Sequence, residues 1–442
     1  MPATALRRPV ALLVALSVLC PAARAAPGRS DPLAGLDAAW PDLDALYVDL
    51  HRTPELSLQE ERTAAKMAAR LRALGFEVTE KVGGHGVVGV LKNGDGPTVL
   101  LRTDMDALPI KEETGLPYAS TVTAKDASGA TVGVMHACGH DVHMTAWMGA
   151  ATLLAGSKDR WRGTLVMVGQ PAEETLAGAR GMLADGLFTR FPRPDFAVTV
   201  HQINMLPAGQ VGVVPGYAMA FVNAVDITVH GKGGHGAGPH ATVDPVLLAS
   251  RIVVALQGIV AREVNPLDPA VITVGSIHGG TKSNIIPDEV KLQLTVRSFK
   301  DEVQKKLLAS ISRMAKGEAI ASGAPREPTI VLSPDAARSL YNDPALAARL
   351  ATALQRDLGQ ERVKDFTPVM GSEDFSEFGR AGVPAMLLWI GSSEPKAFAE
   401  ARAKGTYPPG SHTARLAPDR EPTLRTGVST LTLSALELLG KP

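Results

Sequence analysis

The sequence predicts an α/β fold in which a mostly parallel sheet is covered by helices and carries a smaller inserted domain. Two observations support this prediction. Short apolar runs such as residues 98–101 and 164–168 alternate with helical stretches, which is typical of strands buried on both faces of a sheet. The block from about 217 to 333 instead follows the order β-α-β-β-α-β, which indicates a ferredoxin-like domain.

The expected elements follow from these patterns. In the main domain we expect a helix at about 58–74 that ends at Gly75, a helix from about 142, and strands at 98–101, 164–168, 196–200 and 385–390. In the inserted block we expect strands at about 221–230, 271–277, 289–299 and 329–333, with helices at about 244–262 and 301–321.

The domain boundaries follow from where this alternation stops and resumes. A chain of 442 residues is too long for one small core. We expect a catalytic domain built from residues 26–216 and 334–442, interrupted by an inserted domain at 217–333. The formal net charge is zero and no basic stripe with interleaved aromatic residues occurs, which argues against nucleic acid as a partner.

The first 25 residues have the pattern of a secretory signal peptide. Arg7 and Arg8 precede the apolar run PVALLVALSVLC, and a small-residue A-R-A site follows at 23–25. The apolar run is too short for an anchor, and we expect no later stretch to span a bilayer. The prediction is therefore a periplasmic or secreted protein, cleaved near Ala26, with no membrane anchor.

Polar side chains follow the predicted strands of the main domain. Asp104 and Asp106 come after the first strand, Glu173 and Glu174 after the next, and His201 after the third. In open α/β sheets, ligands bind outside the carboxyl ends of the strands. We therefore expect these side chains to converge on one edge of the sheet.

The segment HACGHDVH, residues 136–143, adds the only cysteine outside the signal peptide. Because Cys20 lies in the leader, Cys138 cannot form a disulfide within the mature chain. A lone cysteine is often a small buried core residue. Beside three histidines and an aspartate, however, Cys138 indicates a metal ligand or a nucleophile.

These segments resemble, in order, the motifs of one enzyme family. The matching stretches are RTDMDALPI, HACGHD, QPAEE, VH at 200–201, GKGGHGAGPH, SNIIPD, TVRSF and GSEDFS. They resemble the co-catalytic metallopeptidase family of aminoacylases and carboxypeptidases. Within it they are most similar to the branch of N-acyl-amino-acid amidohydrolases, hippurate hydrolases and auxin-conjugate (IAA-amino acid) hydrolases. The resemblance implies a zinc-exopeptidase-like catalytic fold with an inserted lid and dimerisation domain.

The resemblance also implies a site for two divalent metal ions. Zinc or manganese is favoured, and nickel or cobalt is also compatible. Carried onto this sequence, the ligands would be Cys138 as a bridging thiolate, His140, Glu174, His201 and His412.

Two further carboxylates have roles in the implied reaction. Glu173 would be the general acid and base, and Asp104 would orient a metal ligand. The sequence departs from the family around His412, in SHTARL. The family usually has a hydrophobic residue before this histidine and a Ser-Pro or Asn-Pro after it. The later APD still fits the family's spacing, so His412 is retained.

The inserted domain supplies the remaining predicted site residues. His235 resembles the residue that family dimers send into the partner's site, where it could donate to the oxyanion. Asn284 and Arg297 resemble substrate-binding positions. Arg297 could hold a free α-carboxylate through paired hydrogen bonds, with Asn284 adding a donor. The open edges of the inserted sheet further predict a homodimer.

The function predicted from these features is metal-dependent hydrolysis of the amide bond in N-acyl amino acids. One alternative is a carboxypeptidase or dipeptidase of the same family, which would act on short peptides. Two others are a non-catalytic binding protein on this fold and a thiol hydrolase with Cys138 as nucleophile, which would be insensitive to chelators. Outside the motifs, we expect ordinary surface or loop histidines at His51, His85 and His278.

Overall fold

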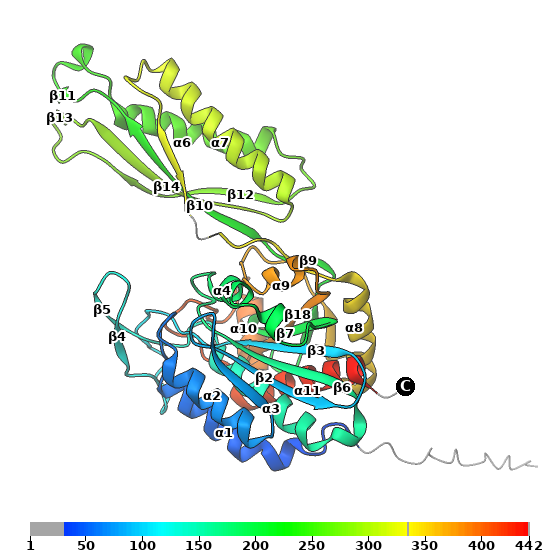
Figure 1. Cartoon of the computed structure of the whole chain (residues 1–442). Coiled ribbons are helices and arrows are strands. Elements are labelled where there is room, and N and C mark those ends of the chain that lie inside the picture. The colour runs from blue at the N-terminus through cyan, green and yellow to red at the C-terminus, as the bar shows by residue number, and fades with distance from the viewer. Residues whose placement is uncertain (1–30, 334–335, 441–442) are drawn as a thin grey trace, which may run out of the picture.

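The computed structural model describes residues 31–333 and 336–440, so the predicted signal peptide lies outside the described residues. The chain forms two bodies (Figure 1). The larger body is built on an eight-stranded sheet and the smaller on a four-stranded sheet. Two chain segments connect them beside a short antiparallel pair, β9 (Gly216–Met219) and β16 (Leu340–Asn342).

The large sheet is mixed but mostly parallel, as the sequence predicted. Strands β6, β3, β7 and β18 form its parallel centre, and β8 and β17 are also parallel to each other. The other pairings, β1 with β2, β2 with β6 and β8 with β18, are antiparallel. In spatial order the strands are β1 (Glu77–Val82), β2 (Gly86–Asn93), β6 (Gly163–Gln170), β3 (Thr98–Asp104), β7 (Phe196–Pro207), β18 (Ala385–Ser393), β8 (Val211–Val213) and β17 (Val363–Asp365).

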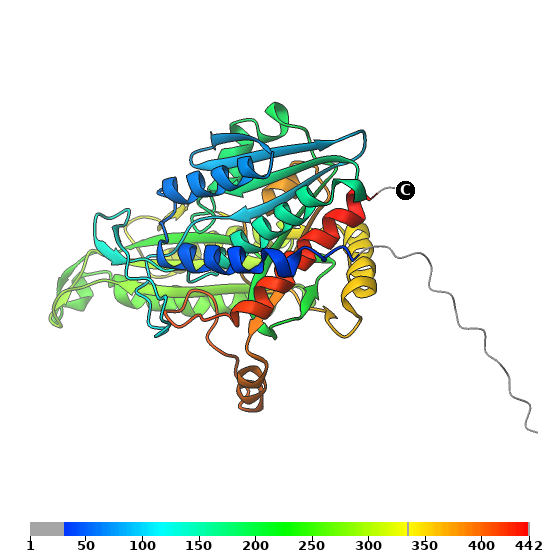
Figure 2. The same cartoon turned by 90° about the horizontal axis from the view of Figure 1, so that it is seen from below.

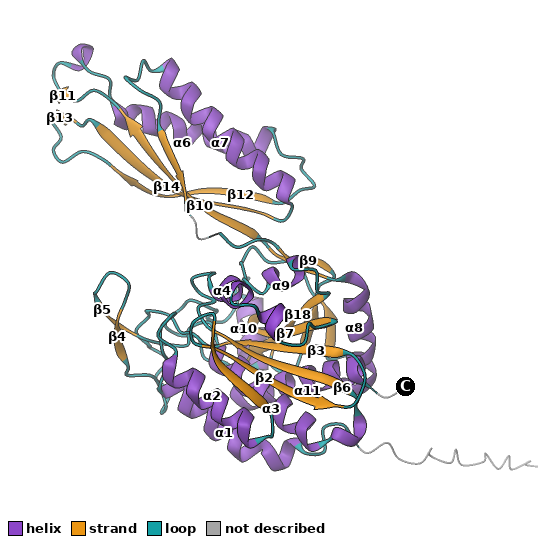
Figure 3. Ribbon diagram, viewed as in Figure 1, coloured by secondary structure: helices purple, strands orange, loops and turns teal. Residues whose placement is uncertain are grey.

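Helices cover both faces of this sheet (Figure 3). Figure 2 shows the dark blue α1 and the red α11 on the same side of it. One hydrophobic core joins this face to α1 (Leu36–Arg52), α2 (Glu61–Ala73), α3 (His140–Gly156), α8 (Pro344–Leu358) and α11 (Arg420–Leu439). A second core joins the other face to α4 (Gly178–Ala184), α5 (Leu187–Arg190) and α9 (Ser376–Arg380). The exposed α10 (Pro395–Ala403) and the hairpin β4 (Thr123–Lys125) and β5 (Thr131–Gly133) project from this body.

The inserted body has the predicted β-α-β-β-α-β order. Its antiparallel sheet has the order β12-β14-β10-β15, and two helices pack on it around a separate core. The elements are β10 (Phe221–His230), α6 (Pro245–Arg262), β12 (Ala270–His278), β14 (Glu289–Ser298), α7 (Asp301–Ala321) and β15 (Thr329–Leu332). A small pair, β11 (Gly234–His235) and β13 (Ile285–Ile286), lies at the tip farthest from the large body (Figure 1).

The structure corrects two expectations about individual elements. His201 does not follow its strand but lies inside β7, because β7 pairs with β18 through the register of His201 and Trp389. Among the described residues, α6 is long and apolar enough to cross a membrane by length and composition, which the sequence analysis did not recognise. Its Leu248, Ile252 and Leu256 are buried in the core of the inserted body.

Candidate metal centre

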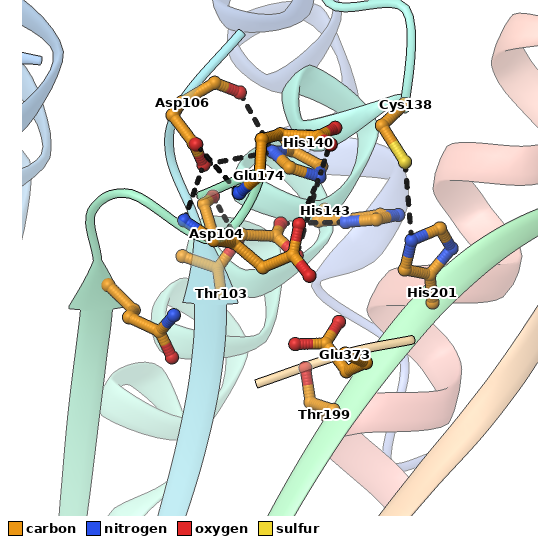
Figure 4. A network of polar contacts seen from close by, with 12 residues as sticks. Thr103, Asp104, Asp106, Cys138, His140, His143, Glu174, Thr199, His201 and Glu373 are labelled. Atoms are coloured by element: carbon orange, nitrogen blue, oxygen red, sulfur yellow. Dashed lines mark hydrogen bonds and ion pairs between the residues drawn. The ribbon is translucent and has the colours of Figure 1, made fainter. Parts of the chain in front are cut away.

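Two groups of potential metal ligands lie side by side at the carboxyl edge of the large sheet. Cys138, His140 and His201 form one group, and Cys138, Glu174 and His412 form the other. Within each group the ligand atoms lie within 4.8 Å of one another, and the Cys138 Sγ belongs to both. All five ligands implied by the resemblance are therefore brought together, with the thiol in the shared position. Figure 4 shows four of them, Cys138, His140, Glu174 and His201.

The hydrogen bonds of the histidines suit metal binding. The Nδ1 of His140 lies 2.8 Å from the backbone oxygen of Asp106, and the Nδ1 of His201 lies 2.7 Å from that of Gln202. A carbonyl only accepts, so both Nδ1 atoms carry the proton and each Nε2 keeps a free lone pair. The buried His140 Nε2 and Glu174 Oε1 have no hydrogen-bond partner. The donor set therefore fits divalent cations.

Local backbone geometry explains how Cys138 and His140 reach the same place. Gly139 between them has φ of 83° and is the N-cap residue of α3. A Cβ at this position would lie 2.6 Å from the Gln202 side chain, so only glycine fits. The motif spacing thus places the thiol just before the helix and the imidazole in its first turn.

His412 reaches the site from a loop rather than from a regular element. Its backbone N–H donates to the Ala137 oxygen at 2.7 Å, and its Nε2 lies 3.3 Å from the Glu174 Oε2. Its φ of 64° is a left-handed conformation that non-glycine residues seldom adopt, and such strain is frequent at functional sites. Its side chain is 58% exposed, so it forms the open side of the otherwise buried site.

Burial strongly affects the acid groups of the centre. It raises the pKa of the Cys138 thiol well above its ordinary value, and the nearby Glu174 carboxylate adds to this effect. A thiolate at this position therefore needs a positive charge beside it. Burial, followed by the charges of Glu373 and Glu174, also raises the pKa of Glu173. A carboxyl with a raised pKa suits a group that must take up and release a proton near neutral pH.

Asp104 lies beside both His143 and the predicted ligand His140, and these three residues form another group of potential ligands. Its Oδ1 accepts a hydrogen bond from the His143 Nδ1 at 2.7 Å, while its Oδ2 lies 3.7 Å from the His140 Nε2. The His143 Nε2 in turn accepts the backbone N–H of Gln202, the residue after His201. Asp104 therefore supports the His201 strand through His143.

Asp106 holds the ligand segments more directly than Asp104 does. Its carboxylate accepts the backbone N–H groups of Glu173 and Glu174 at 3.2 and 3.0 Å, and its backbone oxygen accepts from His140. From the sequence, Asp106 was expected only as one of the polar residues that converge on this edge of the sheet. Its position two residues beyond Asp104 was the available signal, because alternate residues of an extended segment share a face.

A buried arginine neutralises the remaining carboxylates of this edge. Arg102 donates to Asp104, Glu373 and Asp374 at 2.8, 2.8 and 3.2 Å. The Glu373 and Asp374 oxygens also lie within 4.8 Å of one on Glu173, but they are already engaged by Arg102. We therefore infer that Glu373 and Asp374 hold Arg102 in place and do not bind metal themselves.

His51 is not a surface histidine, contrary to expectation. It is 2% exposed, and its two ring nitrogens lie 2.6 Å from Asp141 and 3.1 Å from Glu112. Burial alone would lower its pKa, but the two carboxylates outweigh that effect and raise the pKa to about 10. The charged imidazolium therefore ties α1 to the first turn of α3, which carries His140. His85 is partly buried, whereas His278 is exposed.

The predicted residues of the inserted body do not lie together. Arg297 lies near the large body, where its Nη1 donates to the Met370 oxygen at 2.5 Å. His235 and Asn284 lie at the far tip, where His235 pairs with Ile285 in the β11–β13 ladder. Strand β14 alone separates Arg297 from Glu289 by about 27 Å at ~3.4 Å per residue. Asn284 and Arg297 of one chain therefore do not hold the same carboxylate in this arrangement.

Comparisons with known proteins identify the family of the chain. Residues 100–404 match the model of the family described as peptidase family M20/M25/M40. The chain is 36% identical over 396 residues to thermostable carboxypeptidase 2 of Saccharolobus solfataricus, covering 89% of this chain and 94% of that relative. It is 38% identical over 340 residues to the hippurate hydrolase of Campylobacter jejuni, covering 76% and 85%.

A solved structure agrees over nearly the whole chain. The YXEP protein of Bacillus subtilis, described as a dinuclear metal-binding peptidase of the M20 family, matches with a TM-score of 0.73 and 30% identity. The match covers 91% of this chain and 99% of that one. These comparisons confirm the resemblance read from the motifs. The chain belongs to peptidase family M20/M25/M40 and is a metal-dependent hydrolase of amide or peptide bonds.

Proposed function

We propose that this enzyme is an exported amidohydrolase that uses two divalent ions to cleave the amide bond of N-acyl amino acids. The observation that carries the proposal is the pair of ligand groups sharing the Cys138 Sγ, with Glu173 beside them. Export rests on the signal-peptide pattern of residues 1–25. When bound, paired divalent ions acidify water and stabilise the charge that develops on the amide oxygen.

The protein's own residues supply the proton transfers. Glu173 is buried, and its Oε2 lies 3.8 Å from the His140 Nε2, so its carboxylate faces the ligand groups. There it can take the proton of the attacking water and pass it to the leaving amine. Asp106 keeps both glutamates in place through their backbone N–H groups.

Arg297 is the proposed anchor for the free carboxylate of the substrate. Its positive charge is close enough to His412 to contribute to the lowered pKa of that histidine, after burial and His140. One of the five N–H donors of its guanidinium group donates to the Met370 oxygen. Donors therefore remain for a carboxylate next to the metal edge, which would orient the scissile bond.

A homodimer through the inserted body would complete the site. Strand β12 is an edge of the four-stranded sheet, and the adjacent α6 exposes Leu247 and Val254 to solvent. At the tip, the His235 Nδ1 accepts the Ala237 N–H at 3.0 Å, so the proton is on Nε2. We propose that this Nε2–H and the nearby Asn284 serve the site of a second copy.

Metal dependence provides the first test of the proposal. A chelator is expected to abolish hydrolysis, and zinc or manganese is expected to restore it. Cys138→Ala should lower the bound metal per chain together with the rate, because both ligand groups lose their shared atom. Full activity in chelated, metal-free protein would instead support the thiol hydrolase.

The substrate anchor can be tested by comparing acids with their neutral derivatives. The wild type should cleave N-benzoylglycine and N-acetyl amino acids, but should act poorly on the corresponding amides and methyl esters. Arg297→Ala should raise KM for the acids by about 10- to 100-fold, because a charged hydrogen bond contributes roughly 1.5–3 kcal/mol. Lys291→Ala, an exposed change on the same strand, is the matched control. Equal cleavage of acid and amide forms by the wild type would contradict the anchor.

A carboxypeptidase or dipeptidase remains the second candidate. The 36% identity to a thermostable carboxypeptidase favours it, and the carboxylate anchor would serve a peptide C-terminus equally well. Assays of N-acyl amino acids beside dipeptides of the same leaving residue separate the two. A higher kcat/KM for the peptides would favour the carboxypeptidase or dipeptidase.

A further inference from the structure

The turn that carries Glu173 and Glu174 has an unfavourable backbone conformation. Ala172 and Leu176 have φ values of 52° and 57°, in the left-handed region that side chains disfavour. Gly178 closes the turn, where a Cβ would come within 1.6 Å of the Pro171 oxygen. Such a turn persists only when contacts around it fix its shape.

Two buried carboxylates hold three successive N–H groups of this turn. Ala172 donates to the Glu60 Oε1 at 2.8 Å, and the next two N–H groups donate to Asp106. Successive N–H groups around a left-handed residue form a concave site for anions. Glu60 reaches this site from the loop before α2, 112 residues earlier in the chain.

Glu60 connects its own loop to the turn that carries Glu173. It is wholly buried, its Oε1 also accepts the Leu58 N–H at 2.9 Å, and its Oε2 has no partner. Burial, followed by the charge of Asp106, raises its pKa to about 7. One oxygen thus makes both contacts, and a glutamine would present the same oxygen.

We propose that Glu60 is a positioning residue for the hydrolytic reaction, which fixes Ala172 and thereby aims the side chain of the adjacent Glu173. This inference rests on the function proposed above. Glu174 is held by Asp106 and, when loaded, by its metal. Among the described residues, Glu173 forms hydrogen bonds through its backbone alone, and its Oε2 only approaches the His140 Nε2 at 3.8 Å, so a disturbance at Ala172 acts mainly on Glu173. Loss of Glu60 should therefore lower kcat rather than metal content.

The test compares three substitutions of Glu60 in the metal-loaded enzyme. Glu60→Leu should lower kcat by about 10- to 100-fold, the scale of a small misplacement of a reacting group, while KM and bound metal stay near wild-type values. Glu60→Gln should retain kcat within about threefold, because its amide oxygen can accept both N–H groups. Should Glu60→Leu fail to fold, Glu60→Asp, one methylene too short to reach Ala172, should show the same loss of kcat.

Glu55 provides a matched control in the same loop. It is also buried, and its Oε2 accepts the Thr63 N–H and hydroxyl at 2.7 and 2.9 Å, within α2 and away from the turn. Glu55→Leu should lower Tm but leave the kcat of the folded enzyme unchanged. Wild-type kcat in Glu60→Leu, or an equal kcat loss in Glu55→Leu, would overturn the inference. An inactive wild type would instead refute the proposed function.

Discussion

The metal edge, which is the edge of the large sheet that carries the candidate ligands, differs from the tip of the inserted body in the burial and hydrogen bonding of its predicted site residues. At the edge, Cys138, His140 and His201 are at most 7% exposed, and each histidine is already fixed by a hydrogen bond. At the tip, His235 and Asn284 are both exposed. The candidate ligands of the metal centre thus come together within one chain, whereas the proposed role of His235 and Asn284 requires a second copy.

The largest expected effect separates the paired glutamates within the metal edge. Glu173→Gln should keep both metals but lower kcat by about 10²–10⁴-fold, because the proton carrier is lost. Glu174→Gln should lose or weaken a metal instead, because its carboxylate belongs to a ligand group. Metal analysis of the two purified variants, with kcat for each, checks this division. The reverse pattern would exchange the two roles.

The second prediction tests whether the tip serves another chain. His235→Ala should lower kcat by roughly 10²–10³-fold, the typical cost of a lost oxyanion donor. Mixing this variant with Glu173→Gln should restore activity at one site of each hybrid dimer, because that site has an intact Glu173 and receives an intact His235. Two different affinity tags can verify that hybrid dimers have formed. If verified hybrids remain inactive, His235 either acts in the site of its own chain or takes no part in the reaction.

The smallest expected effect concerns stability rather than rate. The pKa of His51 is raised from 6.5 to about 10 in the folded state, so its contribution is fully present below pH 6.5 and is lost as pH rises to about 10. Wild type should therefore lose on the order of 2–4 kcal/mol of unfolding free energy across this window relative to His51→Gln. Urea unfolding at pH 6.5 and at about pH 10 measures the change in unfolding free energy. His278→Gln, a substitution of an exposed histidine, is the control. Parallel pH profiles for wild type and His51→Gln would contradict the buried ion pair.

Local sequence patterns predicted much of the fold and of the metal edge. The apolar runs around β3, β6 and β18 indicated the parallel centre, and the β-α-β-β-α-β order indicated the inserted body. These predictions succeeded because buried strands and amphipathic helices can be recognised from residues that are close together in the sequence. The family motifs supplied the five predicted ligands. The common direction of the parallel strands accounts for the placement of Glu174 and His201 at one edge of the sheet, whereas Cys138, His140 and His412 come from the start of α3 and from a loop.

Contacts between distant segments escaped the sequence analysis. Glu60 meets Ala172 across 112 residues, and His51 meets Asp141 across 90. Nothing local in either segment distinguishes a buried charged residue from an exposed one. The separation of Asn284 from Arg297 was missed for a similar reason, because the direction and length of β14 decide it.

The sequence by itself determined the class of the protein, the order of its elements and the chemical types of its metal ligands. Only the tertiary structure decided which carboxylates orient those ligands, which histidine is buried between two acids, and which predicted residues lie at opposite ends of the inserted body. The physical reason is that burial and hydrogen bonding are properties of the surroundings. The chain creates those surroundings only when segments far apart in sequence pack against each other.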